Sequence, residues 1–384
     1  MNGPVFYVEK MVHGGWGLVH DRDRAILVRG VVPGEEVRIR IMPGSKKSLF
    51  AEPVEIVSAS PERQEPPCPL FGDCGGCHLQ HISYPFQAGL KKDTLSESIS
   101  RIAGIEPFVS DILTSPVELN YRSRLRLQVK SGKAGFFRAQ SRELIEVYSC
   151  LLVRETINER IAELGPLIKK EKPETIEIVQ EDSGVVMAVA RKGKRKRVFR
   201  FSESEGWVRD PAKKAAFQQV HPEQNQRLRE IVSGIAEKAA PALTIELYAG
   251  DGNLTEMMAP FCGRVIAAES DSEAAELGRE RLAAHKNIEL QNRPAAELLN
   301  ECLLQNERPG LVLLDPPRKG AQEVLPALFQ LVPDYIVYVS CDPPALARDL
   351  KDLSAGGYRV DSIRPLDMFP QTYHLETVAL FIKE

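Results

Sequence analysis

The stretch TIELYAGDGNLTEMM, Thr244–Met258, decides the fold of the second half of the chain. Its apolar start predicts a buried strand, the glycines at 250 and 252 predict a tight turn, and the residues that follow predict a helix. Glycine lets a backbone approach a ligand closely, and a helix N-terminus offers free N–H groups. The spacing differs from G-x-G-x-x-G, so a pyrophosphate is not the expected ligand.

Strands and helices alternate outward from this stretch. From about Pro211 the pattern repeats through RVIAAES, IELQNR, GLVLLDPP and DYIVYVSCDP, each followed by a helical segment, and closes on two further strands. We therefore predict an α/β multidomain protein whose C-terminal part, residues 211–384, is a doubly wound, Rossmann-like domain ending in an antiparallel pair.

The first half of the chain reads differently. Short strands separated by Gly, Pro and Asp turns, such as the alternating EEVRIRI at Glu35–Ile41, predict a small, OB-like β-barrel of five strands over residues 1–58. Residues 59–210 begin with a proline-rich linker and are expected to form a mainly antiparallel central region, with a helix over 157–169. Small barrels of this kind commonly bind oligonucleotides, although a purely structural barrel remains an alternative.

Two acidic residues stand at the carboxyl ends of predicted strands. Glu269 ends the second strand of the α/β domain, where a carboxylate usually binds ribose hydroxyls, and this favours S-adenosylmethionine over NAD. Asp315, in LLDPPRKG, ends the fourth strand, and its carboxyl could hydrogen-bond the edge of a planar base. A helix-capping role is the alternative for both residues.

Cys341 ends the fifth strand, in YVSCDPPALARDL, on the same edge as Asp315. A helix begins just after it, and helix N-termini lower thiol pKa values. Addition of a thiolate at carbon 6 of a pyrimidine would activate carbon 5 for methylation, after which a base must remove the proton at carbon 5. His374 and Glu376 alternate near the C-terminus and could supply that base. A structural cysteine is the competing interpretation.

The cysteines predict a metal site. Cys68, Cys74 and Cys77 are closely spaced, and Cys150 is a plausible fourth ligand. Four thiolates suit either Zn²⁺ or an iron–sulfur cluster, and spacing alone leaves both open.

The composition of the chain limits which binding partners are expected. The net charge of −3 gives no overall attraction to nucleic acid, so local basic patches must provide it. Arg122, Arg124 and Arg126 are expected on one strand face as phosphate ligands, and the basic segment ARKGKRKRVFR is either a second such patch or a solvated hairpin. No apolar run approaches the roughly 18 residues that span a membrane, and no secretory signal is evident. We expect a cytoplasmic monomer without an obligate protein partner.

Taken together, these motifs resemble the uracil-5 methyltransferases of tRNA and ribosomal RNA, in the branch that carries a TRAM domain. The resemblance covers nearly the whole chain and rests on the following segments in family order: GGWGLVH, CPLFGDCGGCHLQH, YRSRLRLQV, AFQQVHPEQN, ELYAGDGNLT, LLDPPRKG, YVSCDPPALARDL and MFPQTYHLETVAL.

The resemblance implies roles for individual residues. Cys341 would be the nucleophile, Glu376 the base and Asp315 a contact to uracil. The S-adenosylmethionine pocket would be lined by Gln219, Tyr248, Gly250 and Glu269, and a [4Fe-4S] cluster, with zinc as the alternative, would be held by Cys68, Cys74, Cys77 and Cys150. RNA would be the substrate, more in the manner of the 23S rRNA enzymes than of the compact tRNA enzymes.

The sequence departs from the family's pattern at several positions. Asp342 and His221 stand where the family usually has asparagine, and an anion at 342 would raise the pKa of the adjacent thiol. Pro294 stands near the position of an aspartate that contacts adenine, and Glu297 is a candidate substitute. Two other functions remain possible: methylation of exocyclic amines, for which Arg318 after Asp-Pro-Pro is unfavourable, and RNA binding without catalysis.

Overall fold

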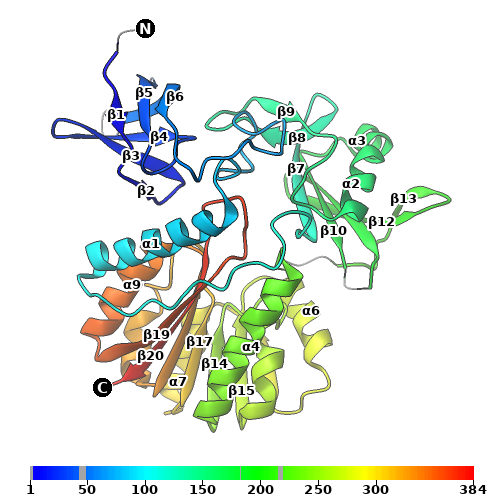
Figure 1. The fold of residues 1–384 in the computed structure, drawn as a ribbon. Coiled ribbons are helices and arrows are strands. Elements are labelled where there is room, and N and C mark those ends of the chain that lie inside the picture. Colours follow the sequence, from blue (N-terminus) through cyan, green and yellow to red (C-terminus); the bar gives the residue numbers. More distant parts are fainter. Residues whose placement is uncertain (1–2, 43–48, 182, 215–218) are drawn as a thin grey trace.

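Three β-sheets organise the protein in this computed structural model, which describes residues 3–42, 49–181, 183–214 and 219–384 (Figure 1). Among these residues no helix is long and apolar enough to cross a membrane. The sheets follow one another along the chain, so each forms from a nearly continuous segment.

The N-terminal sheet has six strands in the order β1-β5-β6-β4-β3-β2, where five were expected. Its strands are β1 (Phe6–Tyr7), β2 (Lys10–Val12), β3 (Trp16–Asp21), β4 (Arg24–Arg29), β5 (Glu36–Ile41) and β6 (Leu49–Ser58). The first two strands are too short to show an alternating pattern in sequence. The long β6 pairs with both β4 and β5, and register shifts along β5 and β6 bend the sheet.

The central sheet is antiparallel throughout, as predicted. It consists of β7 (Arg124–Lys130), β8 (Lys133–Phe137), β9 (Leu144–Glu146), β10 (Thr175–Gln180), β11 (Val186–Lys192), β12 (Arg195–Ser202) and β13 (Gly206–Arg209). Two short helices, α2 (Glu155–Ala162) and α3 (Leu164–Glu171), replace the single helix expected there and share an apolar core with the sheet. Leu125 and Leu127 of β7 point into that core.

The C-terminal sheet has the order β16-β15-β14-β17-β18-β20-β19. Its strands are β14 (Leu243–Leu247), β15 (Arg264–Glu269), β16 (Ile288–Asn292), β17 (Leu311–Leu314), β18 (Tyr335–Ser340), β19 (Tyr358–Leu366) and β20 (Glu376–Lys383). The first five are parallel, and β19 and β20 form the predicted antiparallel pair. This confirms the predicted doubly wound arrangement.

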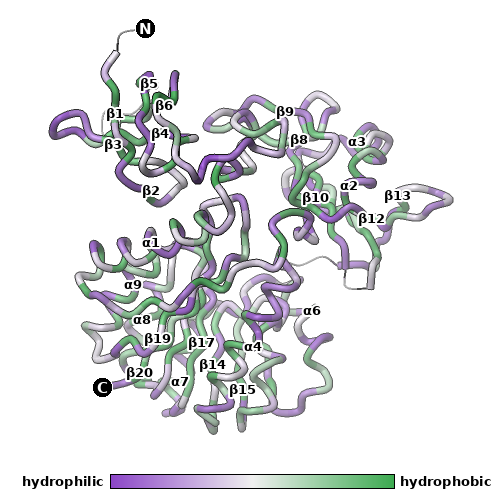
Figure 2. The backbone as a smooth tube through the Cα atoms, viewed as in Figure 1, coloured by the Kyte–Doolittle hydropathy of each residue, from purple (hydrophilic) through white to green (hydrophobic). Residues whose placement is uncertain are grey.

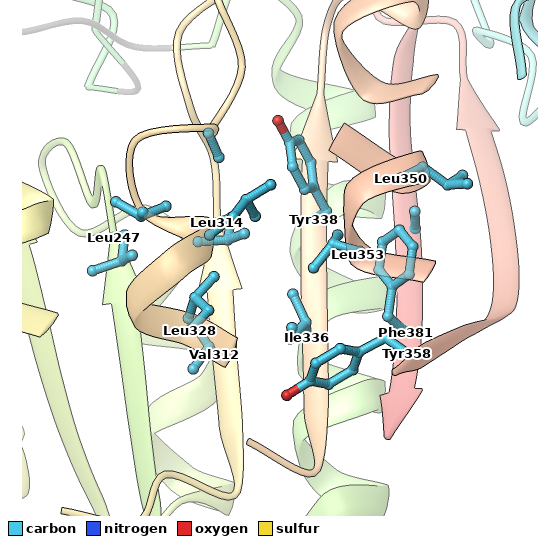
Figure 3. Close-up of a cluster of buried hydrophobic side chains, with 14 of the residues drawn as sticks. Leu247, Val312, Leu314, Leu328, Ile336, Tyr338, Leu350, Leu353, Tyr358 and Phe381 are labelled. Carbon is cyan, nitrogen blue, oxygen red and sulfur yellow. The ribbon is translucent and has the colours of Figure 1, made fainter. Parts of the chain in front are cut away.

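Helices cover both faces of the C-terminal sheet, because alternate residues of its strands point to opposite sides. They are α4 (Pro222–Ala239), α5 (Thr255–Met258), the 3-10 turn Ala259–Phe261, α6 (Ser272–Leu282), α7 (Ala295–Leu304), α8 (Leu325–Leu331) and α9 (Pro343–Ala355). Ile336 and Tyr338 pack with α7, α8 and α9, whereas Val337 and Val339 pack with α4 and α5. Hydrophobic residues accordingly follow the strands in Figure 2, and Figure 3 shows the first of these two cores.

The helix α1 (Tyr84–Ala103) lies against α9 (Figure 1), although it precedes the central sheet in the chain. Leu95 and Ile99 are fully buried in the core of the C-terminal sheet. The chain after α1 continues beside β19, where Val109 pairs with Ile363. Residues 84–113 therefore belong structurally to the C-terminal sheet.

Candidate active site

The strand order brings three chemically active side chains to one edge. β17 and β18 are parallel neighbours, so Asp315 and Cys341, which follow them directly, share that edge. β20 runs antiparallel to β18 and pairs Thr377 with Ser340, which places Glu376 beside Cys341. A thiol and two carboxyl groups thus meet where parallel α/β sheets bind ligands.

A cavity of about 920 Å³ opens at this edge. Its wall includes every residue that the sequence assigned to methyl transfer or to the nucleoside cofactor, namely Gln219, Tyr248, Gly250, Glu269, Asp315, Cys341 and Glu376. The cavity is therefore large enough for two ligands side by side, a nucleoside cofactor near the glycine turn and a planar base near Cys341.

The surroundings of Cys341 oppose ionisation of the thiol. Burial is the main cause, and the charges of Glu376, Asp315 and Asp342 add to it, while Arg318 acts in the opposite direction; together they raise the pKa of Cys341 to about 12. The expectation of a lowered pKa is therefore wrong for this state of the site. The expected effect of Asp342 has the correct sign but is the smallest of these contributions.

The half-buried Asp315 and the buried Glu376 are two carboxyl groups that interact electrostatically. Burial raises the pKa of both groups, and the charge of Asp315 raises the pKa of Glu376 further. Two neighbouring carboxyl groups in such a site hold a proton between them, because both cannot ionise cheaply. The pair can consequently accept a proton near neutral pH, as a general base must.

The glycine turn is closed by Glu269. Its Oε2 atom accepts a hydrogen bond from the Gly250 backbone N–H at 2.9 Å, and its Oε1 atom accepts one from Asp271 N at 2.6 Å. Gly250 has φ +58°, and Tyr248 adopts a left-handed φ of +64°, which directs the chain into the cavity wall. The Tyr248 hydroxyl donates to Glu323 at 3.1 Å.

Only some of the described residues in the segment AFQQVHPEQN line the large cavity. Gln219 lines the cavity, whereas residues 215–218 lie outside those that the structure describes. His221 is buried and caps α4 by accepting from Gln224 N; its Nε2 lies 2.7 Å from Ser115 Oγ, and its ring stacks on Tyr121. Burial lowers the pKa of His221 to about 4, so the ring is a neutral structural element.

Glu297, the candidate substitute for the aspartate that contacts adenine, does not line the large cavity. Pro294 directly precedes α7 without a capping hydrogen bond, and Glu297, in the first turn of that helix, is exposed to solvent. The side chain that meets Glu269 here is Asn292, whose Nδ2 donates to the Glu269 carbonyl at 2.8 Å.

The three arginines do not share one surface. Arg124 and Arg126 line the large cavity and pair with the buried carboxylate of Glu177. Arg122 precedes β7, so strand alternation does not extend to it, and it lines a different cavity. The basic segment forms the β11–β12 hairpin, in which Arg195 and Arg197 both contact Glu171.

The four cysteines meet at that second cavity. Cys68, Cys74, Cys77 and Cys150 all line a space of about 50 Å³ beside Arg122, closed by apolar side chains. Burial raises the pKa of Cys77 to about 12, and the charges of Cys150 and Cys74 contribute. Within the described residues no three His, Cys, Asp or Glu side chains converge closely enough to hold a single ion.

Two residues of the large cavity were missed from sequence. Glu246 of β14 is fully buried, and its Oε2 atom has no partner; burial and the charges of Asp315 and Asp251 raise its pKa to about 8. A glutamate inside an otherwise apolar parallel strand was the available signal. Arg318 lies near His374, with 3.4 Å between Nη2 and Nε2. Its positive charge lowers the pKa of the Cys341 thiol, against the effect of burial.

Known proteins match the chain over most of its length. The family model described as tRNA (uracil-5-)-methyltransferase matches residues 208–384. A 23S rRNA (uracil(1939)-C(5))-methyltransferase from Alkalilimnicola ehrlichii is 31% identical, with 97% of this chain and 95% of the relative covered. An uncharacterized RNA methyltransferase from Bdellovibrio bacteriovorus is 30% identical over 97% and 93%.

A solved structure shares the fold. The Pyrococcus abyssi tRNA (uracil-54, C5)-methyltransferase, in complex with S-adenosyl-L-homocysteine, has a TM-score of 0.68 at 23% identity, covering 98% of this chain and 100% of that one. The agreement extends through all three sheets, since nearly every residue is included.

Proposed function

Because this chain belongs to the class I RNA uracil-5 methyltransferase family, we propose that it methylates carbon 5 of a uridine in RNA, using S-adenosylmethionine. The observation that carries the proposal is the meeting of Cys341, Asp315 and Glu376 in a cavity that also contains the glycine turn. A nucleophile, a base and a cofactor arm within one space are what this reaction requires.

The residues divide the work as follows. Cys341 loses its proton to solvent in the open cavity and its sulfur adds to carbon 6 of the uracil, which makes carbon 5 nucleophilic. The methyl group comes from S-adenosylmethionine bound in the arm lined by Gln219, Tyr248, Gly250 and Glu269. Glu376 then takes the proton from carbon 5, and the electron pair expels the Cys341 thiolate.

Asp315 has a separate role. Its raised pKa lets it keep a proton near neutral pH, so it can donate a hydrogen bond to the oxygen on which charge develops after addition. Arg318, which favours the thiolate, would assist the first step.

The RNA is more plausibly 23S rRNA than tRNA. Full-length relatives with 30–31% identity carry names of 23S rRNA uracil-C5 methyltransferases. The N-terminal sheet, residues 1–58, would act as the TRAM module and bind RNA, and Arg124 and Arg126 at the cavity wall would contact phosphates. In vitro methylation of 23S rRNA and total tRNA in parallel tests this choice; transfer to tRNA alone would reverse it.

The four cysteines fit an iron–sulfur site. A [4Fe-4S] cluster is held by four thiolates, and four thiols line one small cavity. A cluster held by these cysteines would tie the linker segment to the sheet of the central region (59–210). Anaerobically purified protein should show visible absorption that Cys74→Ala abolishes and Cys302→Ala keeps; colourless protein containing zinc would support the alternative metal.

One experiment tests the reaction itself. Protein, S-adenosylmethionine and RNA containing 5-fluorouridine should give an adduct that survives denaturation, because fluorine cannot leave as the proton does. Cys341→Ala should abolish the adduct, and Cys302→Ala, which changes a buried cysteine outside the cavity, should preserve it.

The other outcomes separate the competing functions. Methyl transfer to ordinary RNA by Cys341→Ala would favour exocyclic-amine methylation, which needs no thiol. RNA binding with neither adduct nor transfer would favour a binding protein without catalysis.

A further inference from the structure

The turn between β2 and β3 carries a residue of the N-terminal sheet to the catalytic edge. His13 Nε2 lies 3.8 Å from Asp342 Oδ2, and Asp342 directly follows Cys341. The His13 ring also meets Tyr373 edge-on, at 5.4 Å between ring centroids. The first sheet therefore touches the residue next to the nucleophile.

This approach depends on a glycine. Gly15 has φ +74°, and a Cβ atom there would lie 3.3 Å from His78 Cβ and 3.4 Å from Tyr373 Cβ. A side chain at this position would be strained by the backbone and would crowd both neighbours. The turn is thus packed directly against the segments that enclose the site.

The N-terminal sheet is also firmly attached to the rest of the molecule. A buried apolar cluster joins it to the cysteine segment and to α1 through Met11, Val32, Leu79, Ile82 and Leu90. The fully buried carboxylate of Glu35 bonds Arg63 Nη2 at 2.7 Å and Val32 N at 2.8 Å. His13 is consequently held in place by a rigid support.

Asp342 has two oxygen atoms with different partners. Oδ1 accepts from Ala345 N at 2.9 Å and caps α9, so its position is fixed. Oδ2 faces His13 at a distance longer than a direct hydrogen bond, so the attraction acts between the ring and the charge. Burial and Arg318 lower the pKa of His13 despite the opposing effect of Asp342, and the ring is therefore mainly neutral at pH 7.

We propose that His13 is a positioning residue of the methyl-transfer site: its ring, held against Asp342 Oδ2, partly offsets the charge of that carboxylate and so limits its repulsion of the Cys341 thiolate. The inference rests on the proposed function, since it assigns His13 to the nucleophile of that reaction. It also accounts for an aspartate at 342, because the imidazole N–H compensates for a charge that asparagine would lack.

Alkylation of Cys341 tests the proposal without requiring RNA. The charged groups that act on the thiol are Glu376, Arg318, Asp315 and Asp342. The rate of modification by iodoacetamide is measured against pH, with the Cys341 peptide quantified by mass spectrometry. His13→Phe keeps the ring volume without an N–H and should slow alkylation at pH 8 about threefold to tenfold. His13→Gln, which keeps a donor, should recover most of the rate.

Two controls make the result specific. His20→Phe changes an exposed histidine of β3 that pairs with Glu9, and it should leave the alkylation rate unaltered. In an Asp342→Asn background, where α9 is still capped, His13→Phe should change the rate less than twofold. Equal slowing in both backgrounds, or no slowing in either, would overturn the proposal.

The same variants separate this proposal from the proposed function. If the thiol responds as expected but wild-type protein neither methylates RNA nor forms the 5-fluorouridine adduct, the positioning role stands and the assigned reaction fails. If methylation occurs and the alkylation rates do not couple, the reaction stands and His13 has no positioning role.

Discussion

Cys341 lies where burial and three carboxyl groups all favour the neutral thiol, with Arg318 as the opposing charge. For the proposed reaction, the thiol therefore needs a partner that arrives with the substrate, or a proton acceptor within the site, to become a thiolate. Glu376 and Asp315 lie next to it and share a proton at neutral pH. Proton position among these three groups should control the reaction.

Glu376→Gln should stop the reaction after methyl transfer. The amide cannot take the proton from carbon 5, so the thiol cannot leave, and turnover should fall by about 10²–10⁴-fold. A covalent protein–RNA species should then accumulate on ordinary RNA, visible as a denaturation-resistant band that wild type lacks. Full turnover by this variant would assign the base to another residue.

Glu246→Gln should change how stability depends on pH. The pKa of Glu246 is raised from 4.5 to about 8, so ionisation adds no cost to its burial below pH 4.5, and that added cost grows until pH 8. In urea unfolding, the free energy of unfolding of the variant should therefore rise relative to that of wild type as pH rises. The change should be at most about 1.4 kcal/mol per pH unit.

The control for this prediction is Glu237→Gln, which removes a carboxyl from an exposed position of α4; an equal gain with pH in this variant would contradict the prediction. A constant difference for Glu246→Gln would mean that this carboxyl titrates normally in the folded protein.

Residues at strand ends were predictable, and residues placed by another sheet were not. Asp315, Cys341 and Glu269 follow apolar runs, so strand order alone brings them to one edge. His13 is 328 positions before Cys341 and carries no local pattern; its place depends on how two sheets pack. The pKa of the thiol likewise depended on burial that no motif reveals.

At the scale of elements, α1 shows what periodicity can and cannot predict. Apolar residues recur along it at helical spacing, and Gly104 ends it with φ +72°. The spacing indicates that one face is buried but not which sheet buries it, and α1 packs on α9 rather than on the sheet that follows it. Long-range pairing of this kind needs the assembled surface.

Leu95→Ala should show how strongly the packing of α1 on α9 stabilises the protein. Leu95 is fully buried beside Ile99 in the core of the C-terminal sheet, so truncation leaves a cavity and should cost about 2–5 kcal/mol of unfolding free energy in urea. Leu304→Ala, in a side chain that is 85% exposed, should change stability by less than about 0.5 kcal/mol. A small effect at Leu95 would mean that α1 detaches readily.

At the scale of the whole molecule, the N-terminal sheet is joined to the catalytic part mainly through Glu35, Arg63 and the apolar cluster around Leu79. Through this joint the His13 turn is held beside Asp342, at 3.8 Å, next to the large cavity. The order of the sheets along the chain was predictable from composition and turns, whereas this joint was not, since its members come from three separate segments.

Glu35→Ala should loosen the joint. It leaves the Arg63 cation and the Val32 N–H without their buried acceptor, at a cost of about 3–5 kcal/mol. Amide hydrogen exchange should accelerate in β2, β3 and the His13 turn. The exposed neighbour Glu36→Ala serves as the control, and equal acceleration in both variants would show that the joint does not depend on Glu35.

The placement of α1 has a consequence for synthesis on the ribosome. Leu95 and Ile99 emerge early, but the strand residues that cover them, such as Ile363 and Phe381, are translated last. At about 5–20 residues per second, the apolar face of α1 waits for tens of seconds without its partner. The nascent chain is therefore prone to aggregation until translation is nearly complete. A prematurely terminated chain would keep the apolar face of α1 exposed to solvent.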